Sequence, residues 1–376
     1  KLIINIKTLA IIFLSLSAFS WASVLGNLPR VLFLLSAIIL MYIPRSKSKL
    51  SSNYIFFFSI FIIFAFNSTL HAPDPIRALI KTAEIVLLVI FLARINGNKN
   101  ISHHHCLHVF MYSSFFVTVI SVLPYSFFVK GSFIELSSAI PVINSNTVGS
   151  ISGLMFIYSL NYKNKILQIF SIAILIMSSS ASAMAAIFIA LGTAFLLSHS
   201  TNYNKRLRLI LKLTTLLSII SLIVYYVWFN LLSDEIKSLS GRLTMWEYGT
   251  EYLLAKVGYF HGIGLGNIAV QFESDISRRV SLHNSYLEIF YALGGSFIFL
   301  TGVFIVNALW KCSRASYLLR NSFYLKATVF LLIKGATSSA LSYYTFDFIA
   351  LCFVMMALNE YNFEFKQFRI NQSVEI

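Results

Sequence analysis

Long apolar runs separated by short polar breaks make up most of this chain. A helix needs roughly 20 apolar residues to cross a bilayer, and about twelve runs approach that length. The break within 178–182 is the weakest, because only small serine-rich residues interrupt the apolar pattern there. We predict an all-α polytopic membrane protein with about 12 transmembrane helices over residues 8–25, 30–44, 54–70, 77–93, 107–128, 147–161, 166–178, 183–198, 209–230, 284–309, 327–341 and 343–358.

Composition agrees with that pattern. Hydrophobic residues are 57% of the 376 residues and charged residues 11%, whereas globular domains are about 25% charged. We therefore expect a single membrane domain over 1–376. The first apolar run is expected to be a span and not a removed signal peptide, because no small-residue cleavage site leads into a soluble domain. Cys106, Cys312 and Cys352 are too scattered to predict a disulfide framework or a metal site.

The net charge of +15 does not predict a nucleic-acid-binding protein. The basic residues are spread over many short loops and form no single patch. Most of the 29 basic residues fall on alternate loops, as expected when Lys and Arg remain on the cytoplasmic side. Both termini are then cytoplasmic. The long loop 231–283 lies outside, which in a bacterium is the periplasm.

The first candidate binding motif in the loop 231–283 is Ser240-Gly-Arg242, followed by Trp246. If 242–256 is helical, Arg242 and Trp246 share one face. The guanidinium could then bind phosphate oxygens through two parallel bonds. The indole would lie at the membrane interface. The same two residues would serve equally as an ordinary interfacial anchor.

Three glycines follow, Gly262, Gly264 and Gly266, and then Asn267. They do not match a dinucleotide-binding fingerprint, because no strand precedes them and the third glycine comes too early. Glycines at this spacing permit positive φ and a close backbone approach. They could form a turn whose N–H groups meet an anionic ligand. A tight loop packed against the membrane is the alternative.

His283 and Asn284 stand at the start of the tenth predicted span. Either side chain could cap the free backbone N–H groups of that helix. A solvent-reachable histidine can also accept a proton near neutral pH, and a helix start favours a nearby anion. A structural role for His283 remains the alternative. Gly294-Gly295 further along would let another helix approach closely.

Ionisable residues at membrane depth usually face the interior of a helix bundle and indicate functional paths. Arg77 and Lys81, on one helix face with Glu84, are candidates of this kind, and so is Lys334. Arg279 precedes His283 by four residues and could reach the same site. His103-His-His105 with His108 resembles a metal tract. We place it in a cytoplasmic loop without an acidic partner and expect exposed histidines there.

The order of these motifs resembles the O-antigen polymerase and O-antigen ligase superfamily of bacterial inner-membrane proteins. The resemblance implies a bundle of the GT-C type and a metal-independent glycosyltransferase without a cofactor. It implies a substrate held on undecaprenyl diphosphate at the periplasmic face. The acceptor would be a glycan or the lipid A core, within membrane lipids, and a chain-length regulator is a further candidate partner. The motifs are Ser240-Gly-Arg242-x3-Trp246, Gly262-Ile-Gly-Leu-Gly266-Asn267, His283-Asn284-x-Tyr-Leu287 and Gly294-Gly295.

In that family His283 would be the general base or would orient the acceptor hydroxyl, and Arg242 would bind the diphosphate. The family's pattern has a further arginine after a serine, in the region matching 178–183, but here that region reads Ser-Ser-Ser-Ala-Ser-Ala. Another cation would then bind the donor: Arg279, Arg77, Lys81 or Lys334. This departure favours a polymerase over a ligase. A transporter or flippase is the weaker alternative, because no inverted repeat is visible.

Overall fold

The computed structural model describes residues 5–21, 28–42, 52–97, 101–197, 213, 261–267, 270–271, 279–280, 283–319, 321–339, 341 and 344–374. The predicted span 209–230, apart from Leu213, lies outside these described residues. Arg242 and Trp246 also lie outside them, so their predicted roles stay predictions.

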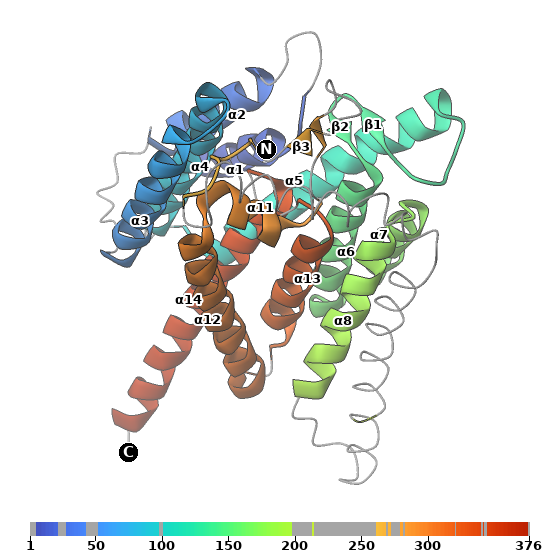
Figure 1. The fold of residues 1–376 in the computed structure, drawn as a ribbon. Helices are drawn as coiled ribbons and strands as arrows, with labels where there is room; N and C mark the ends of the chain where they lie inside the picture. The colour runs from blue at the N-terminus through green and yellow to red at the C-terminus, as the bar shows by residue number, and fades with distance from the viewer. Residues whose placement is uncertain are drawn as a thin grey trace. The chain divides into compact units, whose positions relative to one another are not determined.

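Helices make up most of the described part of the chain, and its strands form two short antiparallel pairs, which confirms the all-α class (Figure 1). The hairpins pair β1 (Ser138–Ala139) with β2 (Val142–Ile143), and β3 (Val270–Gln271) with β4 (Arg279–Val280). Most predicted spans correspond to one helix each, with boundaries shifted by a few residues. The α-helices are α1 (Ile6–Ser17), α2 (Leu28–Tyr42), α3 (Ser52–Leu70), α4 (Pro75–Asn96), α5 (His103–Pro124), α6 (Ser145–Asn161), α7 (Lys165–Met177), α8 (Ala181–Leu197), α11 (Ser285–Leu293), α12 (Gly295–Leu319), α13 (Phe323–Thr337) and α14 (Phe346–Val374), and α5 continues into the π-helix η1 (Tyr125–Val129).

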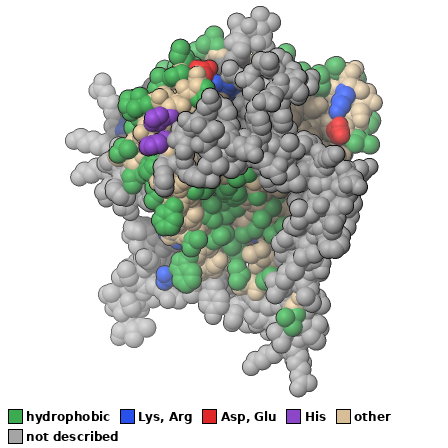
Figure 2. All heavy atoms as spheres, in the orientation of Figure 1, with side chains coloured by type: hydrophobic (Ala, Val, Ile, Leu, Met, Phe, Trp, Pro, Cys, Tyr) green, Lys and Arg blue, Asp and Glu red, His purple; other side chains and the backbone are tan. Residues whose placement is uncertain are grey.

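Two of the described helical segments, His103–Val129 and Gly295–Ser316, are long and apolar enough to cross a membrane. Five further apolar helices are shorter, so twelve spans remain a prediction. Many apolar side chains point outward: Ile166 is 82% exposed and Phe128 80%. Hydrophobic side chains also cover much of the described surface in Figure 2, and charged ones occur in few places. Outward apolar side chains of this kind suit a lipid environment.

The chain divides into two compact units, each built from separate stretches of sequence. Unit 1 comprises residues 1–61, 82–184 and 344–376, and unit 2 comprises 62–81 and 185–343. In unit 1, α1 packs against α2 and α5, and α5 also packs against α6 and α14. In unit 2, the short helix α11 packs against both α12 and α13. Every candidate site residue that the structure describes belongs to unit 2.

The tenth predicted span, 284–309, is not one continuous helix, and this expectation was wrong. The chain forms α11, breaks at Gly294 and resumes as α12. Gly294 ends α11 with φ +85° and ψ 170°, a conformation that essentially only glycine adopts. Only three small residues, Gly294, Gly295 and Ser296, interrupt the apolar run here, which is too short an interruption for the pattern to predict a break.

The histidine tract was also placed wrongly, since His103–His108 form the first turns of α5 and not a loop. The tract does have an acidic partner, Glu360 of α14, whose carboxylate lies 3.8 Å from the Nδ1 atom of His103. The Nδ1 atom of His108 forms a hydrogen bond with the hydroxyl of Tyr158. No group of three metal-ligating side chains occurs among the described residues. The tract therefore joins α5 to α6 and α14 within unit 1.

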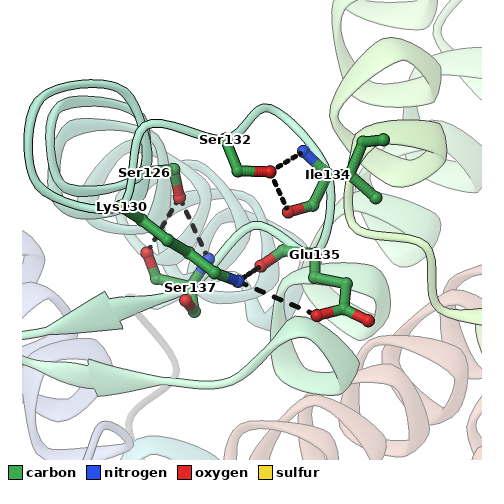
Figure 3. A network of polar contacts seen from close by, with 6 residues as sticks. All are labelled: Ser126, Lys130, Ser132, Ile134, Glu135 and Ser137. Carbon is green, nitrogen blue, oxygen red and sulfur yellow. Dashed lines mark hydrogen bonds and ion pairs between the residues drawn. The ribbon is translucent and has the colours of Figure 1, made fainter.

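The connection between α5 and α6 in unit 1 is ordered by local polar contacts (Figure 3). The Lys130 ammonium donates to the backbone carbonyl of Glu135 at 3.0 Å and lies 3.8 Å from its carboxylate. The Ser126 hydroxyl donates to the carbonyl of Ser137 and accepts from its N–H. The hairpin β1–β2 follows, and the side chain of Asn144 then caps α6 by accepting from the Thr147 N–H at 2.8 Å. This predicted external loop is thus a folded connection.

A buried charge cluster in unit 1 contains Glu84, which the sequence placed on the same helix face as Arg77 and Lys81. A guanidinium nitrogen of Arg30 lies 3.6 Å from the Glu84 carboxylate. The Arg30 guanidinium also stacks over the ring of Tyr344, 4.8 Å from its centroid, and donates to the Tyr344 carbonyl. Pairing is expected of charges withdrawn from water. The carboxylate of Glu84 is thereby engaged with α2.

Candidate functional site

The glycine motif of unit 2 forms a loop that docks on the end of α11. The Ile263 N–H donates to the carbonyl of Tyr291 at 2.8 Å, and the Gly264 N–H donates to the carbonyl of Ala292 at 3.0 Å. The last carbonyls of an α-helix have no partner inside the helix. The loop supplies partners for two of them, and this fixes the path of residues 262–264 across the helix end.

All three glycines adopt positive φ, with values of +71° at Gly262, +81° at Gly264 and +79° at Gly266. A Cβ atom at Gly262 would also lie 2.4 Å from the Ala292 carbonyl oxygen, which is a backbone atom and cannot move aside. The sequence predicted that the glycines permit positive φ and a close backbone approach. Both are confirmed.

Gly264 and Gly266 lie against the start of α4 and the turn before it. A Cβ atom at Gly264 would be 2.9 Å from the Cβ atoms of both Ala72 and Ala78. One at Gly266 would be 2.7 Å from Cγ of Lys81 and 3.5 Å from Cγ of Arg77. The absence of a side chain at Gly266 therefore lets two cations of α4 lie directly beside the loop backbone. Two separate predictions, the glycine turn and the cations Arg77 and Lys81, meet at one place.

Asn267 fastens the loop to the same turn. The Asp74 N–H donates to the side-chain oxygen of Asn267 at 3.2 Å, and the Asn267 amide donates to the Asp74 carbonyl at 2.9 Å. Asp74 in turn caps α4, because its carboxylate accepts from the Arg77 N–H at 3.0 Å. An aspartate followed by Pro75 is a local signal for a helix start. Asn267 was predicted to bind substrate. That role stays a prediction beside the positioning contact seen here.

His283 and Asn284 lie at the other end of α11. His283 has φ +52°, an uncommon conformation outside glycine that is enriched at functional sites. The Asn284 side chain accepts from the N–H groups of Tyr286 and Leu287 at 3.1 and 3.2 Å. Capping by Asn284 is therefore confirmed. His283, just before this cap, is held at the helix entrance at intermediate exposure.

The end of α13 holds the start of α11 in place. The Ser285 N–H and hydroxyl both donate to the carbonyl of Ser338, at 3.1 and 2.7 Å. The Ser339 hydroxyl donates to the Glu288 carboxylate at 2.5 Å, and Glu288 is fully buried. Lys334, in the last turn of α13, is also fully buried. The prediction that Lys334 faces the interior is confirmed within unit 2.

We expect Asn284→Ala to weaken the entrance of α11, because two backbone N–H groups would lose their acceptor. Loss of such a cap costs about 1 kcal/mol. Thermal unfolding of the purified protein in detergent should show a lower Tm for Asn284→Ala and a nearly unchanged Tm for Asn284→Asp, which keeps a capping oxygen. Equal Tm values for wild type and the Ala variant would contradict a stabilising cap. Weak use of a substrate by the Asp variant at normal Tm would support a binding role for Asn284.

The structure thus gathers the predicted site residues into two groups. Gly264, Gly266 and Asn267 join Arg77 and Lys81, whereas His283, Asn284 and Lys334 lie on α11 and α13. The nine residues of α11, about 13 Å at 1.5 Å per residue, separate the loop contact from His283. Arg279 lies between the groups along the chain, in β4 opposite Gln271, and its side chain is outside the described residues.

In the region where the family pattern has an arginine, 178–183, Ser180 is tightly packed in unit 1. A Cβ atom at Gly149 would lie 2.5 Å from the Ser180 Cβ atom, so α6 touches this segment through a glycine. The Ser180 hydroxyl donates to the Asn146 side chain at 3.0 Å, and Ser180 is 3% exposed. The space around Ser180 is filled by α6, which leaves no room there for an arginine side chain without rearrangement.

Comparison with known protein families identifies the segment that carries these motifs. Residues 166–301 match the family model described as O-antigen ligase. The match confirms the predicted resemblance to the O-antigen polymerase and ligase superfamily. It supports activity of the O-antigen ligase or polymerase type, and proteins of this family are membrane proteins. No curated protein matches the chain.

The O-antigen ligase match covers the glycine loop, His283 and the break at Gly294, but not every residue near them. Arg77, Lys81 and Lys334 lie outside residues 166–301, so their assignment depends on the fold. Sequence reasoning missed Asp74 and Ser339, although the Asp74-Pro75 pair was a readable signal for a helix start. It also missed Glu288, because one acidic residue in an apolar helix does not reveal which helix covers it.

Proposed function

We propose that this chain is a glycosyltransferase of the bacterial inner membrane that polymerises a lipid-linked surface polysaccharide at the periplasmic face. Its donor would be a glycan on undecaprenyl diphosphate and its acceptor a second lipid-linked glycan. One observation carries the proposal: Gly266 packs against Arg77 and Lys81 in a loop that the O-antigen ligase match includes. A glycine loop whose backbone lies beside two cations suits a diphosphate.

In the proposed reaction an acceptor hydroxyl attacks the anomeric carbon of the donor glycan. The new carbon–oxygen bond forms as the bond to the diphosphate breaks, and undecaprenyl diphosphate leaves with both electrons. His283 accepts the hydroxyl proton. Arg77, Lys81 and Arg242 stabilise the negative charge that develops on the leaving group, so the chain's own cations would suffice without a metal ion. Positioned proton transfer is typically worth 10² to 10⁴ in rate.

An O-antigen ligase is the second candidate, and the description of the matching family favours it. A ligase would use the same donor and the same residues but transfer the glycan to the lipid A core. The serine segment 178–183 favours the polymerase, since it lacks the arginine of the ligase-like pattern. A chain-length regulator would be a natural partner of a polymerase.

We expect Arg77→Ala and Lys81→Ala each to lower kcat/KM for the lipid-diphosphate donor by about 10- to 100-fold. The reason is that hydrogen bonds to charged groups contribute about 1.5–3 kcal/mol. Lys81→Arg should retain most activity, and Lys165→Ala, an exposed cation at the start of α7, should behave as wild type. The measurement is glycan transfer by the full-length protein in lipid nanodiscs with donor isolated from the host.

The two acceptors are distinguished in the native host with the same variants. Loss of a polymerase should leave lipid A core carrying at most one repeat unit. Loss of a ligase should leave bare core while polymer accumulates on undecaprenyl diphosphate. If a well-expressed Arg77→Ala/Lys81→Ala double variant gives normal surface glycan, the proposed donor site is contradicted for both the polymerase and the ligase.

A further inference from the structure

Two histidines that no motif includes lie together in unit 2, beside the glycine loop. His71 follows the end of α3, and His261 immediately precedes Gly262. Their ring centroids are 4.9 Å apart with an interplanar angle of 41°. Both residues are exposed, so the pair is available to a ligand and is not part of the core.

The orientation of the His261 ring is set by Asn67 of α3. The Nδ1 atom of His261 lies 3.5 Å from the amide nitrogen of Asn67. An amide nitrogen can only donate, so this contact favours the neutral tautomer in which Nδ1 of His261 accepts and the ring proton lies on Nε2. Asn67 thus prepares His261 to donate a hydrogen bond.

The pair and the two cations of α4 border the same short loop. The Cβ atoms of Ala72 and Ala78 pack against Gly264. In the sequence, Ala72 follows His71 and Ala78 follows Arg77. His261 is the residue before the loop, and Gly266 near its end packs on Lys81. The contacts of Gly264 and Asn267 therefore hold the loop against the α3–α4 turn and the start of α4.

We propose that His71 and His261 bind the phosphate oxygens of the lipid-linked donor, as the imidazole side of a site whose other side is Arg77 and Lys81. The inference rests on the proposed function, which supplies the diphosphate. Imidazole N–H groups donate to phosphate oxygens, and such charge-assisted bonds are about twice as strong as neutral ones. Asp74, the acidic residue of this turn, accepts from the backbone N–H of Arg77 as the cap of α4.

The test uses full-length protein in nanodiscs of phosphatidylcholine and measures KM and kcat for undecaprenyl-diphosphate-linked oligosaccharide isolated from the host. His71→Phe and His261→Phe keep the ring contact but remove the N–H donors. His71→Gln and His261→Gln keep a donor but remove the ring. We expect each Phe variant to raise the donor KM about tenfold with kcat changed less than twofold, and each Gln variant to recover most of the loss. The control replaces His105, an exposed histidine of α5 in unit 1. We expect His105→Phe to have the KM and kcat of the wild type.

Several outcomes would overturn this inference. Equal KM values for wild type and the Phe variants would show that the pair does not bind the donor. Normal Phe variants with impaired Gln variants would show that the pair only stabilises the loop by ring contact. If the Phe variants differ from wild type only in bilayers that contain phosphatidylglycerol, the pair binds phospholipid headgroups and not the donor.

The proposed function fails separately from this inference. If wild-type protein transfers no glycan, or if Arg77→Ala leaves donor use unchanged, the donor site itself is refuted. If wild type transfers glycan and Arg77→Ala raises the donor KM while both Phe variants are normal, only the histidine assignment is refuted. Competition by inorganic pyrophosphate adds a direct comparison: it should inhibit wild type more strongly than either Phe variant.

Discussion

Replacement of His283 by alanine is expected to abolish glycan transfer, with a loss of at least about 100-fold in kcat. The expectation follows from its proposed role, because a positioned general base typically contributes 10² to 10⁴ in rate. The geometry supports such a role: His283 immediately precedes the cap of α11, and contacts between Ser285 and Ser338 hold that helix entrance. The measurement is glycan transfer in nanodiscs together with the surface glycan of the native host.

A second variant separates chemistry from backbone conformation at this position. His283 has φ +52°, and asparagine tolerates this region better than alanine does. His283→Asn should therefore keep the conformation but lose the base, and we expect it to be as inactive as His283→Ala. His105→Ala provides a histidine control on α5. Activity in the Asn variant alone would assign His283 a conformational role, and normal glycan in both well-expressed variants would refute the catalytic role.

Gly262→Ala is expected to have the largest effect on stability. A Cβ atom there would lie 2.4 Å from the Ala292 carbonyl oxygen and 2.8 Å from the Gly294 nitrogen. Left-handed φ in alanine costs about 1–2 kcal/mol, and overpacking typically costs a further 1–3 kcal/mol. We expect the Tm in detergent to fall by at least about 5 °C and donor use to fall with it, because the loop would leave the end of α11.

Gly302→Ala is the matched control for this experiment. Gly302 lies inside α12, and a Cβ atom there would meet nothing within 4 Å. Alanine in a helix interior is favoured over glycine by roughly 0.5–1 kcal/mol, so the Tm should stay the same or rise slightly. A Gly262→Ala protein with wild-type Tm and activity would show that the loop does not dock on α11 as described.

The positions of most helices followed from local signals. Apolar run length located α2–α8 and α13 within a few residues, whereas α1 ends eight residues before its predicted end, and the capping preference of asparagine correctly marked the entrance of α11. The break at Gly294 was missed because only three small residues, Gly294, Gly295 and Ser296, interrupt a longer apolar run. The histidine tract was misplaced because Glu360, its partner, is more than 250 residues away in sequence.

The order of the motifs around His283 was sufficient to recognise the superfamily, and the O-antigen ligase match confirmed it. The motifs could not show which cation binds the donor. The sequence offered four equal candidates: Arg77, Lys81, Lys334 and Arg279. The fold brings Arg77 and Lys81 beside Gly266, whereas it buries Lys334 at the end of α13. This difference favours Arg77 and Lys81 as the donor-binding cations.

By itself the sequence determined the helical class, the approximate helix positions and the identity of the glycine and histidine motifs. These features depend on run length, capping and spacing, which are properties of neighbouring residues. Only the tertiary structure decided that the glycine loop closes the end of α11, that Arg77 and Lys81 back it, and that His71 meets His261. The contacts of Gly266 with Arg77 and Lys81 and of His71 with His261 join residues roughly 190 positions apart. Their formation depends on how helices pack, since the glycines remove side chains that would otherwise keep the loop away from α4.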